Sequence, residues 1–167
     1  MEPKIYTYDE VRAMAMDGDI MFLTVNKKDY LSRLTSWFTK SPFTHAAFLF
    51  WYHGRLMVVE STTHGGIRIV QASTYKDRNF GLIAAPRPWE FIIDDALVRS
   101  GTAEYGWFSA MYIGMREFAL KQFNVRLPVN KNNRNKACSE FVAEVLGLKD
   151  VDISPKRLYD ILNAPVV

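Results

Sequence analysis

The residues of this chain best suited to do chemistry are Cys138, which is its only cysteine, and the polar pair His45 and Glu60. A thiol becomes a nucleophile when an imidazole takes its proton, and a carboxylate on the other ring nitrogen fixes the tautomer of that imidazole. Taken singly, each residue has a plainer interpretation: Cys138 as helix filler, His45 as an incidental strand histidine, Glu60 as a solvent-facing carboxylate. Taken together, they indicate a nucleophile, a general base and a residue that orients the base.

The surroundings of Cys138 predict that it begins a helix. The polar stretch 130–136 is typical of a loop, and the following pattern predicts a helix over 137–146 that Gly147 closes. The buried stripe of that helix has the spacing i, i+3, i+4, i+7 and i+8, and it consists of Cys138, Phe141, Val142, Val145 and Leu146. In the first turn, unpaired backbone N–H groups and the helix dipole stabilise a thiolate.

A predicted β-hairpin brings His45 and Glu60 together. Residues 44–52 and 55–61 are rich in strand-forming side chains and flank a two-residue turn, His53 and Gly54. This register places Ala47 opposite Glu60 and puts His45 on the same face, diagonal to Glu60 at a backbone separation of about 7–8 Å. A register error of one residue would send Glu60 to the opposite face, so the contact depends on the turn.

The remaining elements predict an α+β domain over residues 1–167, with an antiparallel central sheet packed against helices. At this length one core is expected. Before the hairpin we expect a helix that is capped by Thr7 and Glu10 and stops at Asp17-Gly18, a strand at 19–25 and a short helix at 29–39. After the hairpin we expect strands at 66–70 and 81–85. One long amphipathic helix should then begin at about 94 and carry the apolar residues from Tyr105 to Ala119, and a short helix should open at Ser154-Pro155.

Composition narrows the function classes. The 21 basic residues are scattered and the net charge is only +3, so nucleic acid is not an expected partner. A single cysteine allows no internal disulfide, and three histidines without zinc spacing predict no metal site; no glycine-rich phosphate loop is present, so no cofactor is expected. The sequence shows neither a leader peptide nor an apolar run of roughly 18 residues, which predicts a cytoplasmic product.

Several short motifs, taken in order, resemble the circularly permuted papain-like cysteine hydrolases of the NlpC superfamily. The likeness covers roughly residues 18–148 and points to the branch that includes relatives of lecithin:retinol acyltransferase and bacterial and viral proteins. In that branch a catalytic histidine on a strand precedes the cysteine on a helix, the reverse of the order in papain. The motifs are Gly18-Asp19-Ile20, Thr44-His45-Ala46-Ala47, Val58-Val59-Glu60-Ser61, Gly66-Ile67-Arg68-Ile69-Val70 and Ala137-Cys138-Ser139-Glu140-Phe141-Val142.

The resemblance implies a permuted papain-like fold and a role for each matching residue. Cys138 matches the nucleophile, whose backbone N–H would help to hold the oxyanion of an acyl-enzyme; His45 matches the base, and Glu60 the third polar residue. Acyltransferase relatives often carry histidine in third place, and His64 competes with Glu60 for that role. Asp19 matches a recurring Gly-Asp pair, which we interpret as the turn that opens a strand.

The function expected from these residues is that of a cysteine peptidase, amidase or acyltransferase. The acyl substrate would be a cell-wall peptide, a lipid-linked acyl group or a small molecule, and aromatic residues near His45 in sequence, such as Trp37 and Trp51, are compatible with peripheral contact with lipid. A phage or virus could encode such a protein. The alternative is an inactive interaction or virion protein that keeps the fold; the oligomeric state stays open.

Overall fold

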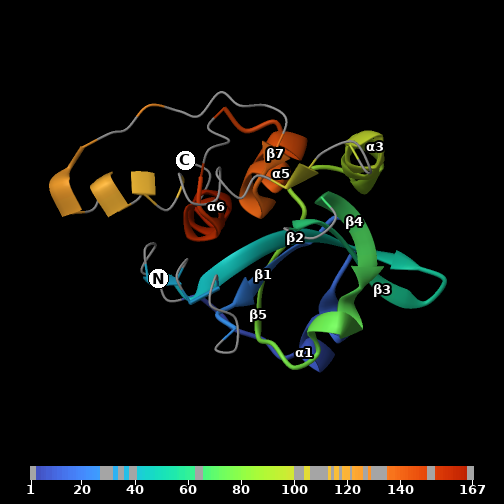
Figure 1. Ribbon diagram of the computed structural model, residues 1–167. Coiled ribbons are helices and arrows are strands. Elements are labelled where there is room, and N and C mark those ends of the chain that lie inside the picture. The colour runs from blue at the N-terminus through green and yellow to red at the C-terminus, as the bar shows by residue number, and fades with distance from the viewer. Residues whose placement is uncertain are drawn as a thin grey trace.

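The chain folds as an α+β protein around a five-stranded antiparallel sheet with helices on both faces (Figure 1). The order of strands across the sheet is β4-β3-β2-β1-β5. The computed structural model describes residues 3–26, 32–33, 36–37, 41–62, 66–99, 104–105, 113, 115–116, 118–120, 122–125, 128, 135–149 and 153–164.

The elements follow the expected alternation of strands and helices along most of the chain. The strands of the large sheet are β1 (Ile20–Thr24), β2 (Phe43–Tyr52), β3 (Arg55–Thr62), β4 (Gly66–Gln71) and β5 (Phe80–Ile83). A small parallel pair is formed by β6 (Glu104–Tyr105) and β7 (Asn135–Lys136). The helices are α1 (Tyr8–Met14), the 3-10 helix η1 (Ala72–Tyr75), α3 (Trp89–Arg99), α5 (Cys138–Val145) and α6 (Pro155–Leu162).

The large sheet buries apolar side chains on both of its faces, because successive strand residues point to opposite sides. On one face Phe22 and Phe48 pack with α3, α5 and α6. On the other face Leu23 and Leu49 pack with α1 and η1. The sheet is therefore the middle of three layers, and α5 lies over one face of it (Figure 1).

The hairpin of β2 and β3 has the predicted turn and register. His53 and Gly54 have φ values of 48° and 72°, as a type I′ turn requires, and Tyr52 pairs with Arg55. Pairing continues without a slip as far as Phe48 and Val59. The turn and this part of the register are confirmed, whereas Ala47 and Glu60, which were predicted to face each other, are not paired.

Helix ends also follow the sequence signals. Thr7 and Glu10 form the predicted capping box at the start of α1, and the Thr7 N–H donates to a Glu10 carboxylate oxygen at 2.7 Å. Ser154 caps α6, since its hydroxyl accepts the Arg157 N–H. Gly147 follows α5 with a φ of +71°, which favours glycine. Local signals therefore set these boundaries correctly.

Two predictions for the middle of the chain are wrong. The single long helix from about residue 94 does not form: α3 runs from Trp89 to Arg99, and Tyr105 lies in β6. Residues 135–136, predicted as loop, form β7 and pair with β6. Strands of two residues have no periodicity to detect, and their pairing depends on contacts distant in sequence. Of the helix predicted at 29–39, the described residues 32–33 and 36–37 are helical.

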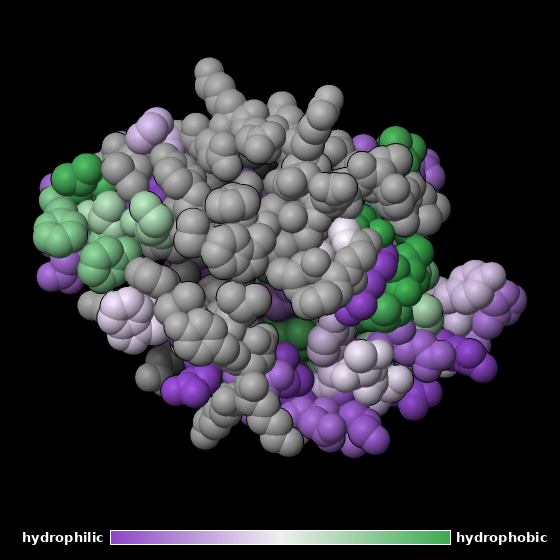
Figure 2. All heavy atoms as spheres, viewed as in Figure 1, coloured by the Kyte–Doolittle hydropathy of each residue, from purple (hydrophilic) through white to green (hydrophobic). Residues whose placement is uncertain are grey.

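Exposed apolar side chains gather near the helical residues between 113 and 123, on the left of Figure 2. Trp37 is 65% exposed and stacks on Phe118 at 6.2 Å between ring centroids, and Phe118 meets Phe123 edge to face. No helix in the described part of the chain has the length and apolar character needed to cross a bilayer.

Candidate active site

Cys138 lies in the first turn of its helix, as predicted, and is the first residue of α5, one residue after the predicted start. Hydrogen bonds hold this end of the helix in place. Ala137 precedes the helix in extended conformation and its N–H donates to a Glu140 carboxylate oxygen at 2.7 Å. The Ser139 hydroxyl donates to the Ile153 carbonyl at 2.6 Å, which ties the helix to the chain before α6. The thiol therefore projects from a fixed first turn.

A separation between β2 and β3 lets the helix reach the sheet. Phe48 and Val59 form the last pair of the hairpin, and before Phe48 strand β2 has no partner in β3. The backbone N–H and C=O of Leu49 both bond to the residues just before β1, so alternation directs those of Ala46 toward β3. On that side the Ala46 N–H faces the Cys138 thiol and favours its ionised form, and α5 contacts both strands.

His45 and Glu60 meet as the hairpin register predicts. The Nε2 atom of His45 lies 2.7 Å from Oε2 of Glu60, a hydrogen bond that joins β2 and β3 beyond their last backbone pair. The Glu60 side chain is fully buried, and the His45 side chain is 18% exposed. With Nε2 engaged by the carboxylate, Nδ1 is the ring nitrogen left to exchange a proton with the thiol.

Glu60 has two further partners that sequence reasoning missed, Arg68 and Tyr75. The Arg68 guanidinium donates from Nε to Oε1 of Glu60 at 3.0 Å, and its Nη2 atom forms an ion pair with the same oxygen at 3.0 Å. The Tyr75 hydroxyl lies 2.7 Å from both carboxylate oxygens. Arg68 stands directly opposite Glu60 in the β3–β4 register, so extending the pairing to the third strand would have found it. Tyr75 comes from η1, for which we see no sequence signal.

Charge interactions favour an ionised Cys138–His45 pair. Burial alone would lower the pKa of His45, but the facing Cys138 thiolate and hydrogen bonds to Cys138 and Glu60 raise that pKa to about 10. Burial alone would raise the pKa of Cys138, but the His45 charge, with N–H groups of Ala46 and Ser139, lowers it below its ordinary value. Both shifts favour a thiolate beside an imidazolium.

The Glu60 carboxylate completes this arrangement as a fixed negative charge. Burial alone would raise the pKa of Glu60, but hydrogen bonds and charge from His45, then hydrogen bonds from Tyr75 and Arg68, lower it. The carboxylate therefore stays ionised and favours the charged form of His45. A buried carboxylate with this many donors is strongly constrained in position.

The other residues singled out from the sequence have different places. Asp19 is 6% exposed, and its carboxylate accepts the N–H groups of Met16 at 2.9 Å and Ala85 at 3.2 Å. It holds the turn before β1, beside Gly18 with its φ of +88°, in agreement with the structural interpretation. His64 lies outside the described residues.

Neither a metal cluster nor a known family offers a different interpretation of the site. Over the part of the chain that the structure describes, no three His, Cys, Asp or Glu side chains gather where they could hold a metal ion. In comparisons with known proteins, no family model and no curated protein matches this chain. The function must therefore be inferred from the geometry of Cys138, His45 and Glu60.

The hydroxyl of Tyr75 should contribute measurably to stability through Glu60. Tyr75→Phe removes one donor from a buried, ionised carboxylate, and a hydrogen bond to a charged group contributes about 1.5–3 kcal/mol. Urea unfolding measures the loss. The control is Tyr52→Phe, because Tyr52 is 60% exposed at the end of β2. This variant should change the free energy of unfolding by about 0.5 kcal/mol or less. Equal losses in the two variants would show that the Tyr75 hydroxyl does not support Glu60.

Proposed function

We propose that this protein is a cysteine hydrolase or acyltransferase that cleaves an amide, thioester or ester bond through an acyl-enzyme on Cys138. The observation that supports it most is the buried series of contacts from the Cys138 thiol through His45 to Glu60. A space-filling cysteine needs neither a charged imidazole beside it nor a buried carboxylate behind that imidazole. His45 is the general base and acid, and Glu60 orients it.

The proposed reaction has two steps. The Cys138 thiolate attacks the carbonyl carbon, and the oxyanion forms near the Cys138 N–H. The first hydrogen bond of the helix runs from the Phe141 N–H to the Ala137 carbonyl, so the Cys138 N–H has no acceptor within the helix. The His45 imidazolium gives its proton to the leaving amine, alcohol or thiol as the bond breaks. A water or an amine acceptor then attacks the thioester and gives a proton to His45, and the thiolate is released.

The fold supports the proposed relation to permuted papain-like hydrolases. The base lies on a strand of an antiparallel sheet that precedes the nucleophile helix in sequence, and the nucleophile is the first residue of that helix. Glu60 stands at the third place on the strand that follows the base. A carboxylate there favours the hydrolase-like members over those with histidine.

One observation favours the alternative, an inactive interaction or virion protein. Cys138 is only 6% exposed, and a substrate carbonyl has to reach its sulfur. A thiol that no reagent reaches would leave the charged pair without a chemical role. Reactivity of this single thiol therefore separates the two functions.

The experiment is acylation by p-nitrophenyl acetate, followed by intact-mass spectrometry. The thiolate attacks the acetyl carbonyl and displaces p-nitrophenolate, so the expected product is the protein with one acetyl group on Cys138. Cys138→Ala should remove both this labelling and the release of p-nitrophenolate, because the variant has no thiol to acylate. If folded wild-type protein gave neither an acetyl adduct nor p-nitrophenolate above the level of Cys138→Ala, the enzyme would be rejected and the inactive alternative favoured.

A further inference from the structure

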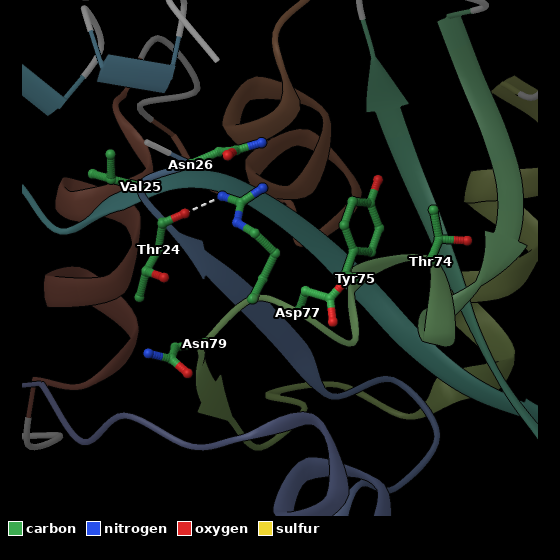
Figure 3. A pocket seen from close by; sticks show the side chains of 8 residues that line it. Thr24, Val25, Asn26, Thr74, Tyr75, Asp77 and Asn79 are labelled. Carbon is green, nitrogen blue, oxygen red and sulfur yellow. Dashed lines mark hydrogen bonds between the residues drawn. The ribbon is translucent and has the colours of Figure 1, made fainter. Parts of the chain in front are cut away.

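A pocket of about 530 Å³ lies next to Tyr75, which is one of its lining residues (Figure 3). It is formed by the end of β1 with the two residues after it, and by the segment that runs from η1 to the start of β5. Its volume is within the range of about 300–1,000 Å³ that is usual for sites of small ligands. The size suits a few linked amino acids or a compact small molecule.

The side chains that line this pocket are mostly polar, which is unusual because ligand sites are commonly lined by apolar groups. Among the described lining residues, Thr24 and Thr74 carry hydroxyl groups, Asn26 and Asn79 carry amides, and Asp77 carries a charge. Each amide offers both a donor and an acceptor. An aliphatic chain placed here would strip water from these groups without returning hydrogen bonds, and such desolvation is costly.

The Arg78 side chain, which lines the pocket, is hydrogen-bonded to the main chain. The Arg78 guanidinium donates from NH2 to the carbonyl oxygen of Thr24, as the dashed line in Figure 3 shows. The Thr24 N–H in turn donates to the carbonyl of Asn79 at 3.0 Å, so main-chain contacts join the two walls. The pocket is therefore a built feature of the fold between β1 and β5.

Tyr75 connects the pocket to the candidate active site. Tyr75 lines the pocket, and its hydroxyl donates to Glu60. Its ring centroid is 6.3 Å from that of His45. Thr24, on the opposite wall, pairs with Phe43 two residues before His45. A ligand in the pocket would contact Tyr75, the residue whose ring lies next to that of His45.

We propose that this pocket binds the polar, amide-containing part of a peptide-like substrate, and not the aliphatic chain of a lipid. That the ligand is a substrate rests on the proposed function. The binding itself requires no thiol, so it can be tested in a protein that lacks the nucleophile. The Thr24 and Thr74 hydroxyls and the Asn79 amide would pair with the N–H and C=O groups of the ligand.

The test titrates ¹⁵N-labelled Cys138→Ala protein with trialanine and, separately, with octanoate, which also carries a carboxylate. Trialanine should shift the side-chain amide signals of Asn26 and Asn79 in a saturable way, with a dissociation constant of about 1 mM. Octanoate should leave them in place. Asn79→Trp fills the pocket from an exposed position and should abolish the trialanine shifts, whereas Asn163→Trp, on an exposed residue after α6, should preserve them.

Three results would overturn the proposal: no shifts with trialanine, saturable shifts with octanoate, or trialanine binding that survives Asn79→Trp. If the protein binds trialanine as expected but is not acetylated by p-nitrophenyl acetate, the pocket is supported as a binding site and the catalytic function is refuted. If the protein is acetylated but does not bind trialanine, the catalytic function is supported and the peptide-like substrate is refuted.

Discussion

Replacing His45 with alanine should slow the acetylation of Cys138 at pH 7 by about 10²–10⁴-fold, the range that a positioned general base contributes. The physical reason is the loss of the charge that lowers the pKa of Cys138. Without His45, burial is the largest remaining influence and raises that pKa, so the thiol is mostly neutral at pH 7. Release of p-nitrophenolate under single-turnover conditions measures the rate.

The matched control is a histidine outside the site. His53 is exposed in the hairpin turn with a φ of 48°, and His53→Asn keeps a residue that tolerates this conformation. It should leave the acetylation rate unchanged. A similar loss of rate in His53→Asn and His45→Ala would indicate a general disturbance of the hairpin and contradict a role for His45 as base.

Replacing Glu60 with alanine should cost about 3–5 kcal/mol of the free energy of unfolding, the loss expected when one partner of a buried ion pair is removed. The change leaves the imidazolium of His45 and the hydroxyl of Tyr75 without their common acceptor. It also opens a cavity at a fully buried position. For a domain whose total stability is about 5–15 kcal/mol, urea unfolding should show a large shift in midpoint.

Two further variants make the Glu60 prediction specific. Glu60→Gln keeps the volume and removes the charge, so it should lose less stability than Glu60→Ala while the pKa of His45 falls, because a charged acceptor is gone. Asp94→Ala removes an exposed carboxylate on α3 and should change stability by about 0.5 kcal/mol or less. If Glu60→Ala were as stable as Asp94→Ala, Glu60 would not hold the site together.

Much of the site could be predicted from sequence because its parts depend on local rules. A two-residue turn at His53 and Gly54 sets the register of two adjoining strands, and alternation then puts His45 and Glu60 on the same face, where they meet. The start of α5 follows from an apolar helical stripe whose first member is Cys138. Both predictions involve neighbours in the chain or a single strand pair.

The rest depended on contacts that no local pattern reports. Arg68 reaches Glu60 only through a third strand, and Tyr75 reaches it from a 3-10 helix after that strand. Tyr105 fits a helical spacing, yet β6 pairs with a strand at 135–136, about thirty residues later. The separation of β2 from β3 next to Cys138 likewise has no signal in the sequence of either strand.

The most direct test of the central claim is the pH dependence of Cys138 alkylation by iodoacetamide in wild type and in His45→Ala. Alkylation reports the thiolate, and a chain with one cysteine gives one signal. Because His45 keeps its proton up to a pKa of about 10, the wild-type rate should rise with an apparent pKa well below the value of about 8.5 for a free thiol. In His45→Ala the apparent pKa should move above that value, since burial then dominates. An unreactive Cys138, or a profile that His45→Ala leaves unchanged, would contradict the thiolate–imidazolium pair and with it the catalytic role.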